Sequence, residues 1–223
     1  MEEIRIMEKP DWVTWDEIAE CIHIGQATNN KKGFDMQFGH LTSEELEKDV
    51  KGKSGEGYTF VALNEHNKVV GTYSLTVTMV NKWWHKGRCG LRCNTSILPE
   101  YRGTDAYFGL RELLEKKEKE LGLNVIWGTT SEKNDVVIKI NKKTGWKFVE
   151  YVPSPLKRDY FSYVFVKWKD GCPYKENLIN FRFKLSRFYS RFVYRYNGTR
   201  KVNRFTHWLH RVKRFTHWLH RDR

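Results

Sequence analysis

Hydrophobic residues recur along this chain with two different periods, one typical of strands and one typical of helices. Alternating or continuous short apolar runs predict strands, at residues 3–7, 58–63, 69–80, 88–98, 124–130, 146–151 and 160–168. Helical spacing predicts helices at residues 14–22, 42–51, 106–122 and 136–145, and Thr14 and Thr42 each open a capping box. The pattern predicts an α/β (α+β) fold with a mixed, mostly antiparallel sheet of about seven strands flanked by helices.

Two connecting segments stand out between these elements. Residues 26–40 are polar and contain glycine, so we expect a long loop there, and loops of that length tend to be functional. Trp83 and Trp84 mark a turn between two strands that we expect to pair antiparallel.

Residues 97–122 combine the end of a strand, a short loop and a helix. The loop turns through Pro99 and Arg102-Gly103, and Leu110, Leu113, Leu114 and Leu121 fall on one face of the helix that follows. Backbone N–H groups at a helix N-terminus have no partner inside the helix and carry a partial positive charge, which favours phosphate. A pyrophosphate is therefore the ligand that this stretch suggests first.

The order of elements over residues 3–168 resembles the GNAT superfamily of N-acetyltransferases. Three local matches carry the resemblance, namely FVALNEHNKVVGTYSL, ILPEYRGTDAYFGLRELL and NDVVIKINKKTGWKFV. They are similar to that family's second and third strands, its acyl-CoA loop with the helix that follows, and its closing segment. The resemblance implies an acyltransferase that moves an acetyl group from acetyl-CoA, as co-substrate, to an amine.

The resemblance also implies which residues bind acetyl-CoA, with two departures from the family pattern. The implied binding residues are Ile97, Leu98, Arg102, Gly103, Thr104, Asp105, Ala106, Tyr107 and Asn134. Arg102 matches the pattern, whereas Asp105 and Tyr107 occupy positions where the family has small residues. We therefore expect Tyr107 to point away from the phosphates, and Thr104 or Asp105 to cap the helix.

Candidate catalytic residues are less well marked. The family often has a Tyr acid seven residues after the position of Asn134, and this chain has Asn141 there. Glu100, His85 and Asp35 are candidates for the general base that takes a proton from the attacking ammonium. We expect strand N–H groups around residues 94–97 to polarise the thioester carbonyl.

A metal site receives little support from the sequence. His85, Cys89 and Cys93 fall at intervals of four, which places them on one face of a strand, but no fourth ligand is evident. We therefore expect no metal.

The net charge of +13 is concentrated at the C-terminal end. Residues 175–223 contain 14 of the 40 basic residues and two of the 27 acidic residues, so they carry +12 and the preceding residues carry +1. We therefore divide the chain into a GNAT-like domain, residues 1–170, and a basic amphipathic helical tail, residues 171–223.

The tail pattern favours an anionic membrane surface as the partner. Phe181, Leu185 and Phe188 share one arc with later aromatic residues, and the octamer RFTHWLHR occurs at 204–211 and again at 214–221. Two alternatives remain: nucleic acid as the partner, or a helix that packs on the sheet and is followed by a loose end.

The expected activity is N-acetylation by a cytoplasmic protein held at the inner face of a membrane. The first residues lack the apolar core of a signal peptide, and four cysteines without framework spacing are typical of free thiols. An amino sugar of a surface-glycan precursor, bound near residues 26–40 and Trp83-Trp84, is the suggested acceptor, and a longer acyl group is an alternative. A second hypothesis is a binding module that has lost catalysis and acts through its tail.

Overall fold

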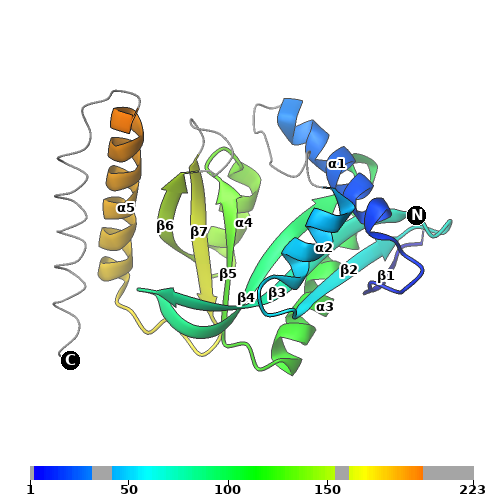
Figure 1. Cartoon of the computed structure of the whole chain (residues 1–223), viewed down its shortest axis with the longest axis horizontal. Coiled ribbons are helices and arrows are strands. Elements are labelled where there is room, and N and C mark those ends of the chain that lie inside the picture. Colours follow the sequence, from blue (N-terminus) through cyan, green and yellow to red (C-terminus); the bar gives the residue numbers. More distant parts are fainter. Residues whose placement is uncertain (1–2, 32–41, 154–160, 198–223) are drawn as a thin grey trace.

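A computed structural model describes residues 3–31, 42–153 and 161–197, and its centre is one seven-stranded sheet (Figure 1). The strand order is β1-β2-β3-β4-β5-β7-β6, and β4–β5 is the only parallel pair. The mixed, mostly antiparallel sheet is thus confirmed. The strands are β1 (Arg5–Glu8), β2 (Gly57–Leu63), β3 (Val69–Lys82), β4 (His85–Ile97), β5 (Val125–Ser131), β6 (Lys147–Pro153) and β7 (Phe161–Trp168).

Helices cover both faces of the sheet (Figure 1). Helices α1 (Trp15–Lys31) and α2 (Ser43–Lys51) lie together on one face, and each begins with the expected capping box at Thr14 and at Thr42. Helix α3 (Ala106–Glu120) packs on the opposite face of β1, β2 and β3. The short 3₁₀ helix η2 (Pro99–Tyr101) precedes α3, and α4 (Asp135–Lys143) follows β5.

The apolar positions that define the predicted elements form the core. Ile18 and Ile22 of α1 and Leu110 and Leu114 of α3 are fully or almost fully buried in one large cluster with the sheet. A second cluster lies near the other end of the sheet, and it contains Trp84. Because Trp84 is 1% exposed, it is a core residue, and the structure does not support the expectation that it contacts an acceptor.

Helix α1 is longer than the sequence pattern suggests. It continues to Lys31, so residues 26–31, expected as the start of a loop, are helical. Residues 26–31 contain no glycine or proline, so nothing in the sequence ends the helix there. In addition, the Gln26 side chain donates a 3.4 Å hydrogen bond to the Thr95 carbonyl of β4. The rest of that segment, residues 32–41, lies outside the described residues.

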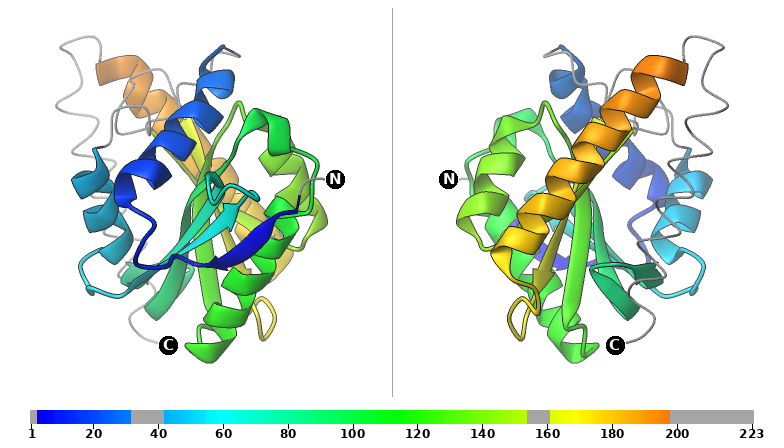
Figure 2. Two further views of the ribbon diagram at one scale, coloured as in Figure 1. Left: turned by 90° about the vertical axis from the view of Figure 1, so that its right-hand side faces the viewer. Right: turned by 90° about the vertical axis from the view of Figure 1, so that its left-hand side faces the viewer.

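Helix α5 (Glu176–Asn197) lies against β6, at the end of the sheet farthest from β1 (Figure 2). It contacts the sheet through Ile179 and Phe183, and two serines bond to the outer edge of β6. The amide of Tyr151 donates to Ser186 Oγ at 2.9 Å, and Ser190 Oγ donates to the Tyr151 carbonyl at 2.6 Å. The first part of the predicted tail is therefore packed on the domain.

The octamer repeat at 204–211 and 214–221 lies outside the described residues. Within the described ranges, no helix combines the length and the apolar character that crossing a membrane requires.

Candidate functional site

The parallel strands β4 and β5 pair over a short distance and then separate. Their pairing runs from Gly90↔Ile126 to Arg92↔Gly128, whereas β4 continues to Ile97 along β3 and β5 continues to Ser131 along β7. Residues 93–97 of β4 and 129–131 of β5 therefore have no strand-to-strand hydrogen bonds with each other. The two strand edges leave backbone N–H and C=O groups that a ligand with amide groups can pair.

A bulge in β4 lies just beyond the last of these pairs. The register with β3 shifts between Thr72 and Ser74, and Asn94 has a positive φ of 52°. Asn94 is 3% exposed, and neither its Nδ2 nor its Oδ1 has a hydrogen-bond partner in the part of the chain that the structure describes. Because buried polar groups are nearly always paired, an unpaired carboxamide at this opening points to a ligand.

Helix α4 contributes a second unpaired amide. Asn141, at the position where the resemblance leads us to look for an acid, is the one buried residue of α4, and its Nδ2 has no partner within residues 3–31, 42–153 and 161–197. Asn134 is the N-cap of the same helix, and its Oδ1 accepts from the Val137 amide at 3.2 Å. The capping role of Asn134 leaves its amide nitrogen as the group that could contact a ligand.

Arg102 holds the loop after β4 against α1. Its Nη2 donates to the Gly25 carbonyl at 2.6 Å and its Nε donates to the Ile97 carbonyl at 3.3 Å. The close approach of α1 to β4 requires glycine at position 25, because a Cβ there would lie 2.1 Å from Ser96 Oγ. Gly103 follows with a φ of 86°, a conformation that favours glycine, and it turns the chain towards α3.

At the start of α3, one of the two expected capping residues bonds to the backbone and the other does not. Thr104 Oγ1 accepts from the Ala106 amide at 3.3 Å, whereas Asp105 is exposed and makes no capping bond. Of the two expected caps, Thr104 therefore takes the role and Asp105 does not. Leu98 and Ala106 are buried and fix the two ends of the loop in the core.

The Tyr107 ring packs against the hydrophobic core rather than over the loop. It stacks on Tyr73 of β3, with ring centroids 6.4 Å apart and planes 19° apart. Burial raises the pKa of the Tyr107 hydroxyl, with Tyr73 as the next cause. The expectation that this ring points away from a phosphate therefore agrees with the geometry.

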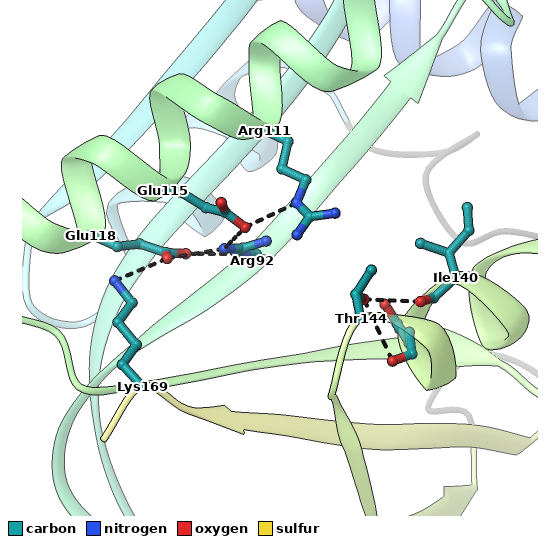
Figure 3. A network of polar contacts seen from close by, with 8 residues as sticks. Arg92, Arg111, Glu115, Glu118, Ile140, Thr144 and Lys169 are labelled. Atoms are coloured by element: carbon teal, nitrogen blue, oxygen red, sulfur yellow. Dashed lines mark hydrogen bonds and ion pairs between the residues drawn. The ribbon is translucent and has the colours of Figure 1, made fainter. Parts of the chain in front are cut away.

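A buried group of ion pairs holds α3 to β4 just before the strands separate (Figure 3). Arg92, in the last β4–β5 pair, donates from Nε to Glu118 Oε1 at 2.6 Å and from Nη2 to Glu118 Oε2 at 3.0 Å. Lys169 reaches Glu118 at 3.3 Å, and Glu115 links Arg92 to Arg111. These contacts fix the point at which the opening begins.

The structure places the candidate bases at different ends of β4. Glu100 is exposed in η2, directly after the strand and beside the loop. His85 begins β4, nine residues before Asn94, which is about 30 Å along a strand. The structure therefore does not bring His85 to the opening, and Asp35 lies outside the described residues.

The cysteines of β4 are thiols rather than nucleophiles or ligands. Burial raises the pKa values of Cys89 and Cys93 to about 12, so both stay protonated near neutral pH. His85, Cys89 and Cys93 are spaced along the strand by about 13 Å each, too far apart to share an ion. Among the described residues, no group of three or more His, Cys, Asp or Glu side chains could hold a metal.

Sequence reasoning missed two polar groups near this site. Asn94 gives no sequence signal. Its side chain is buried at a bulge, and that bulge depends on how β3 pairs with β4. His23 of α1 lies two residues before Gly25, and its Nε2 is buried without a hydrogen-bond partner among the described residues. A lone histidine in a helix carries no sequence signature, so neither residue could be selected in advance.

Comparisons with solved structures identify the fold. A GNAT-family acetyltransferase from Staphylococcus aureus aligns with a TM-score of 0.56 at 18% identity, covering 75% of this chain and 99% of that one. A GNAT-family acetyltransferase from Streptococcus agalactiae gives 0.57 at 19%, covering 75% and 96%.

A third match is a chain of the NatC complex, whose structure holds a Gag peptide and CoA, at 0.56 and 11% identity, covering 74% and 98%. No protein-family model matches the sequence, and no curated protein does. This chain therefore has the GNAT fold, and the expected resemblance is confirmed at the level of the fold.

Proposed function

We propose that the protein is an N-acetyltransferase that uses acetyl-CoA and an amine acceptor. The observation that carries the proposal is the opening between β4 and β5, which leaves unpaired strand edges leading to the N-terminus of α3. The GNAT fold supports the same reaction, since the matched structures are described as acetyltransferases and one holds CoA.

The loop and α3 supply the features that a diphosphate needs. The first amides of α3 have no partner within the helix, although the Ala106 amide is capped by Thr104, and Arg102 carries a positive charge on the loop before them. Asp105 opposes binding because its exposed carboxylate repels phosphate. We infer that the arm of acetyl-CoA runs from this loop into the opening, where Asn94 and Asn141 pair with its amide and carbonyl groups.

Direct transfer is the chemistry that these side chains support. The amine nitrogen attacks the thioester carbonyl carbon, the C–S bond breaks, and the sulfur leaves as the thiolate of CoA, which then takes a proton. Strand amides next to the bulge, with the Asn141 Nδ2 as a further donor, stabilise the developing oxyanion. An amide group cannot give the thiolate a proton, so water supplies it, and protonated Cys93 forms no acyl intermediate.

Glu100, directly after β4, and His23, two residues before Gly25 in α1, are the candidate bases that remain. The Nε2 atom of His23 has no other bonding role among the described residues, and Glu100 is exposed beside the loop. Either group could accept the ammonium proton directly or through a water molecule. We propose an amino sugar, or a related amine of a surface-glycan precursor at a membrane, as the acceptor, supported by the basic helix α5.

One observation favours a second function. Asn141 occupies the position at which an acid would assist thiolate departure, and the loop carries Asp105 where a small residue would help binding. These features suit a GNAT-fold binding module that no longer catalyses transfer. Such a module would bind CoA or its partner without turnover.

Calorimetric titration with acetyl-CoA and a thiol-release assay over a panel of amines separate the two functions. We expect binding and, with at least one amine, release of CoA. Binding without release for any amine supports the binding module. No heat with acetyl-CoA at millimolar concentration contradicts the enzyme and leaves the binding module that acts through its tail.

Two substitutions test where the diphosphate lies. Arg102→Gln should weaken acetyl-CoA binding by about tenfold, since it removes a charge-assisted contact. Asp105→Asn should strengthen binding by about fivefold, since it removes a repulsive charge. Glu112→Gln makes the same charge change at an exposed position two turns further along α3 and should leave the Kd unchanged. Equal effects of Asp105→Asn and Glu112→Gln would show that the diphosphate does not contact this loop.

A further inference from the structure

Helix α5 leaves an apolar stripe on the side turned away from the sheet. Its docking face consists of Ile179, Phe183, Ser186 and Ser190, which contact β6 and β7. At about 100° per residue, a second set falls on the opposite side of the helix. That set, the outer stripe, consists of Leu178, Phe181, Leu185 and Phe188, whose exposures are 41%, 62%, 50% and 67%.

Exposed apolar side chains are ordinary when they are scattered, but these four are contiguous. They recur over eleven residues at intervals of three and four, so they form one continuous line along the helix. The stripe therefore needs an occupant that covers it with apolar groups.

Basic residues border the stripe on both sides. Helix α5 contains five basic residues and one acidic residue, Glu176, at its first position. Lys184 and Arg187 are exposed and have no carboxylate partner among the described residues. Arg182 lies over Trp83 at 5.4 Å and Arg191 over Tyr151 at 5.6 Å, so the domain itself holds these two cations at the edges of the stripe.

The charge identifies the occupant. The segment that follows α5, residues 198–223, contains eight basic residues and Asp222 as its one acid, so it would repel a cationic helix rather than cover it. A second copy would bring the same positive charge to the interface. We propose that the outer stripe of α5 lies in the plane of an anionic lipid bilayer, with its aromatic residues in the headgroup boundary and its basic residues at lipid phosphates.

This inference does not depend on acetyl transfer, and it differs from an anchor formed by a separate tail. The serine bonds to β6 fix α5 on the domain, so the helix would place the whole sheet at a set orientation to the bilayer. One helix can serve both surfaces because its docking face and its outer stripe lie on opposite sides.

Vesicle co-sedimentation of the full chain tests the proposal. Wild type should bind vesicles of phosphatidylcholine with phosphatidylglycerol and should not bind phosphatidylcholine alone, and binding should fall as salt increases. The triple variant Phe181→Ser/Leu185→Ser/Phe188→Ser should lower the partition coefficient by at least about tenfold. Lys184→Gln/Arg187→Gln should lower it by about fivefold for each charge removed.

Matched controls separate this surface from the rest of the chain. Met79→Ser removes an equally exposed apolar residue from β3 and should change nothing. The full-length variant Trp208→Ser/Trp218→Ser tests the repeat region. Circular dichroism and the Tm of each variant should match wild type, since all substituted α5 side chains are exposed.

Three results would overturn the proposal. The first is equal binding to neutral and anionic vesicles. The second is a triple α5 variant that binds like wild type while the double tryptophan variant loses binding. The third is binding to a single-stranded oligonucleotide that requires Phe181 and Phe188, in the absence of vesicle binding, which would assign the surface to nucleic acid.

Discussion

The outer edge of β6 and the opening between β4 and β5 both lack a strand partner, and the two places differ in how their polar groups are bonded. At the outer edge of β6, Ser186 and Ser190 of α5 bond to the free amide and carbonyl of Tyr151. Near the opening between β4 and β5, by contrast, Asn94 of β4 and Asn141 of α4, the helix that follows β5, are buried, and their amide nitrogens have no partners among the described residues. An unpaired buried group costs free energy, so its persistence is expected where a ligand completes the bonding.

The largest expected effect concerns the ion pairs that define the start of the opening. Glu118→Leu leaves Arg92 buried without its main partner, so the free energy of unfolding should fall by about 3–5 kcal/mol. Urea unfolding followed by circular dichroism measures it. Glu120→Leu, at an exposed position of the same helix, should cost less than about 1 kcal/mol.

The double variant Arg92→Met/Glu118→Leu sharpens this test. Because it removes both charges, it should recover most of the stability that Glu118→Leu loses. If both variants are equally unstable, packing rather than the unpaired charge is responsible.

A medium effect is expected at the covered edge. Ser190→Ala leaves the Tyr151 carbonyl unpaired, so stability should fall by about 1 kcal/mol, although alanine favours the helix slightly. Hydrogen exchange should show a faster Tyr151 amide in Ser186→Ala. Asn180→Ala is the control, since Asn180 is exposed on the same helix and should lose no stability. Slow exchange at Tyr151 in Ser186→Ala would indicate that the edge does not rely on the serine.

The smallest effect on stability, with the opposite sign, is expected at the opening. Asn141→Leu removes an unpaired donor and introduces a better helix former, so the free energy of unfolding should stay the same or rise by up to about 1 kcal/mol. The same change should reduce acetyl-CoA binding or CoA release. A clear loss of stability would show that Asn141 has a bonding role in the free protein, and the contrast with β6 would fail.

Local patterns predicted most of the fold. Features that depend on a few neighbouring residues were predictable. They include both capping boxes, the order of strands along the chain, the turn at Trp83-Trp84 and the end of α4 near Gly145. The end of α1 was missed, since a polar sequence without glycine or proline can continue a helix when a side chain such as Gln26 finds a tertiary partner.

The candidate site was predictable only in part. The loop at Arg102 and Gly103 follows from the pattern of the chain, whereas the orientation of Tyr107 was expected only from the resemblance to the family. The roles of Thr104 and Asp105 at the start of α3 could not be separated, because both are good capping residues and the backbone angle decides between them. The unpaired state of Asn94 and His23 and the distance of His85 from the opening depend on how strands and helices pack together.

The amino-acid sequence by itself determined the alternation of strands and helices, the loop with Gly103 before α3 and the strong positive charge near the C-terminus. These properties arise from side chains that are close in sequence. Tertiary structure alone decided where β4 and β5 separate, which carboxamides stay unpaired, and which face of α5 packs on β6. Those outcomes depend on contacts between residues far apart in the chain, whose hydrogen bonds and burial no local spacing encodes.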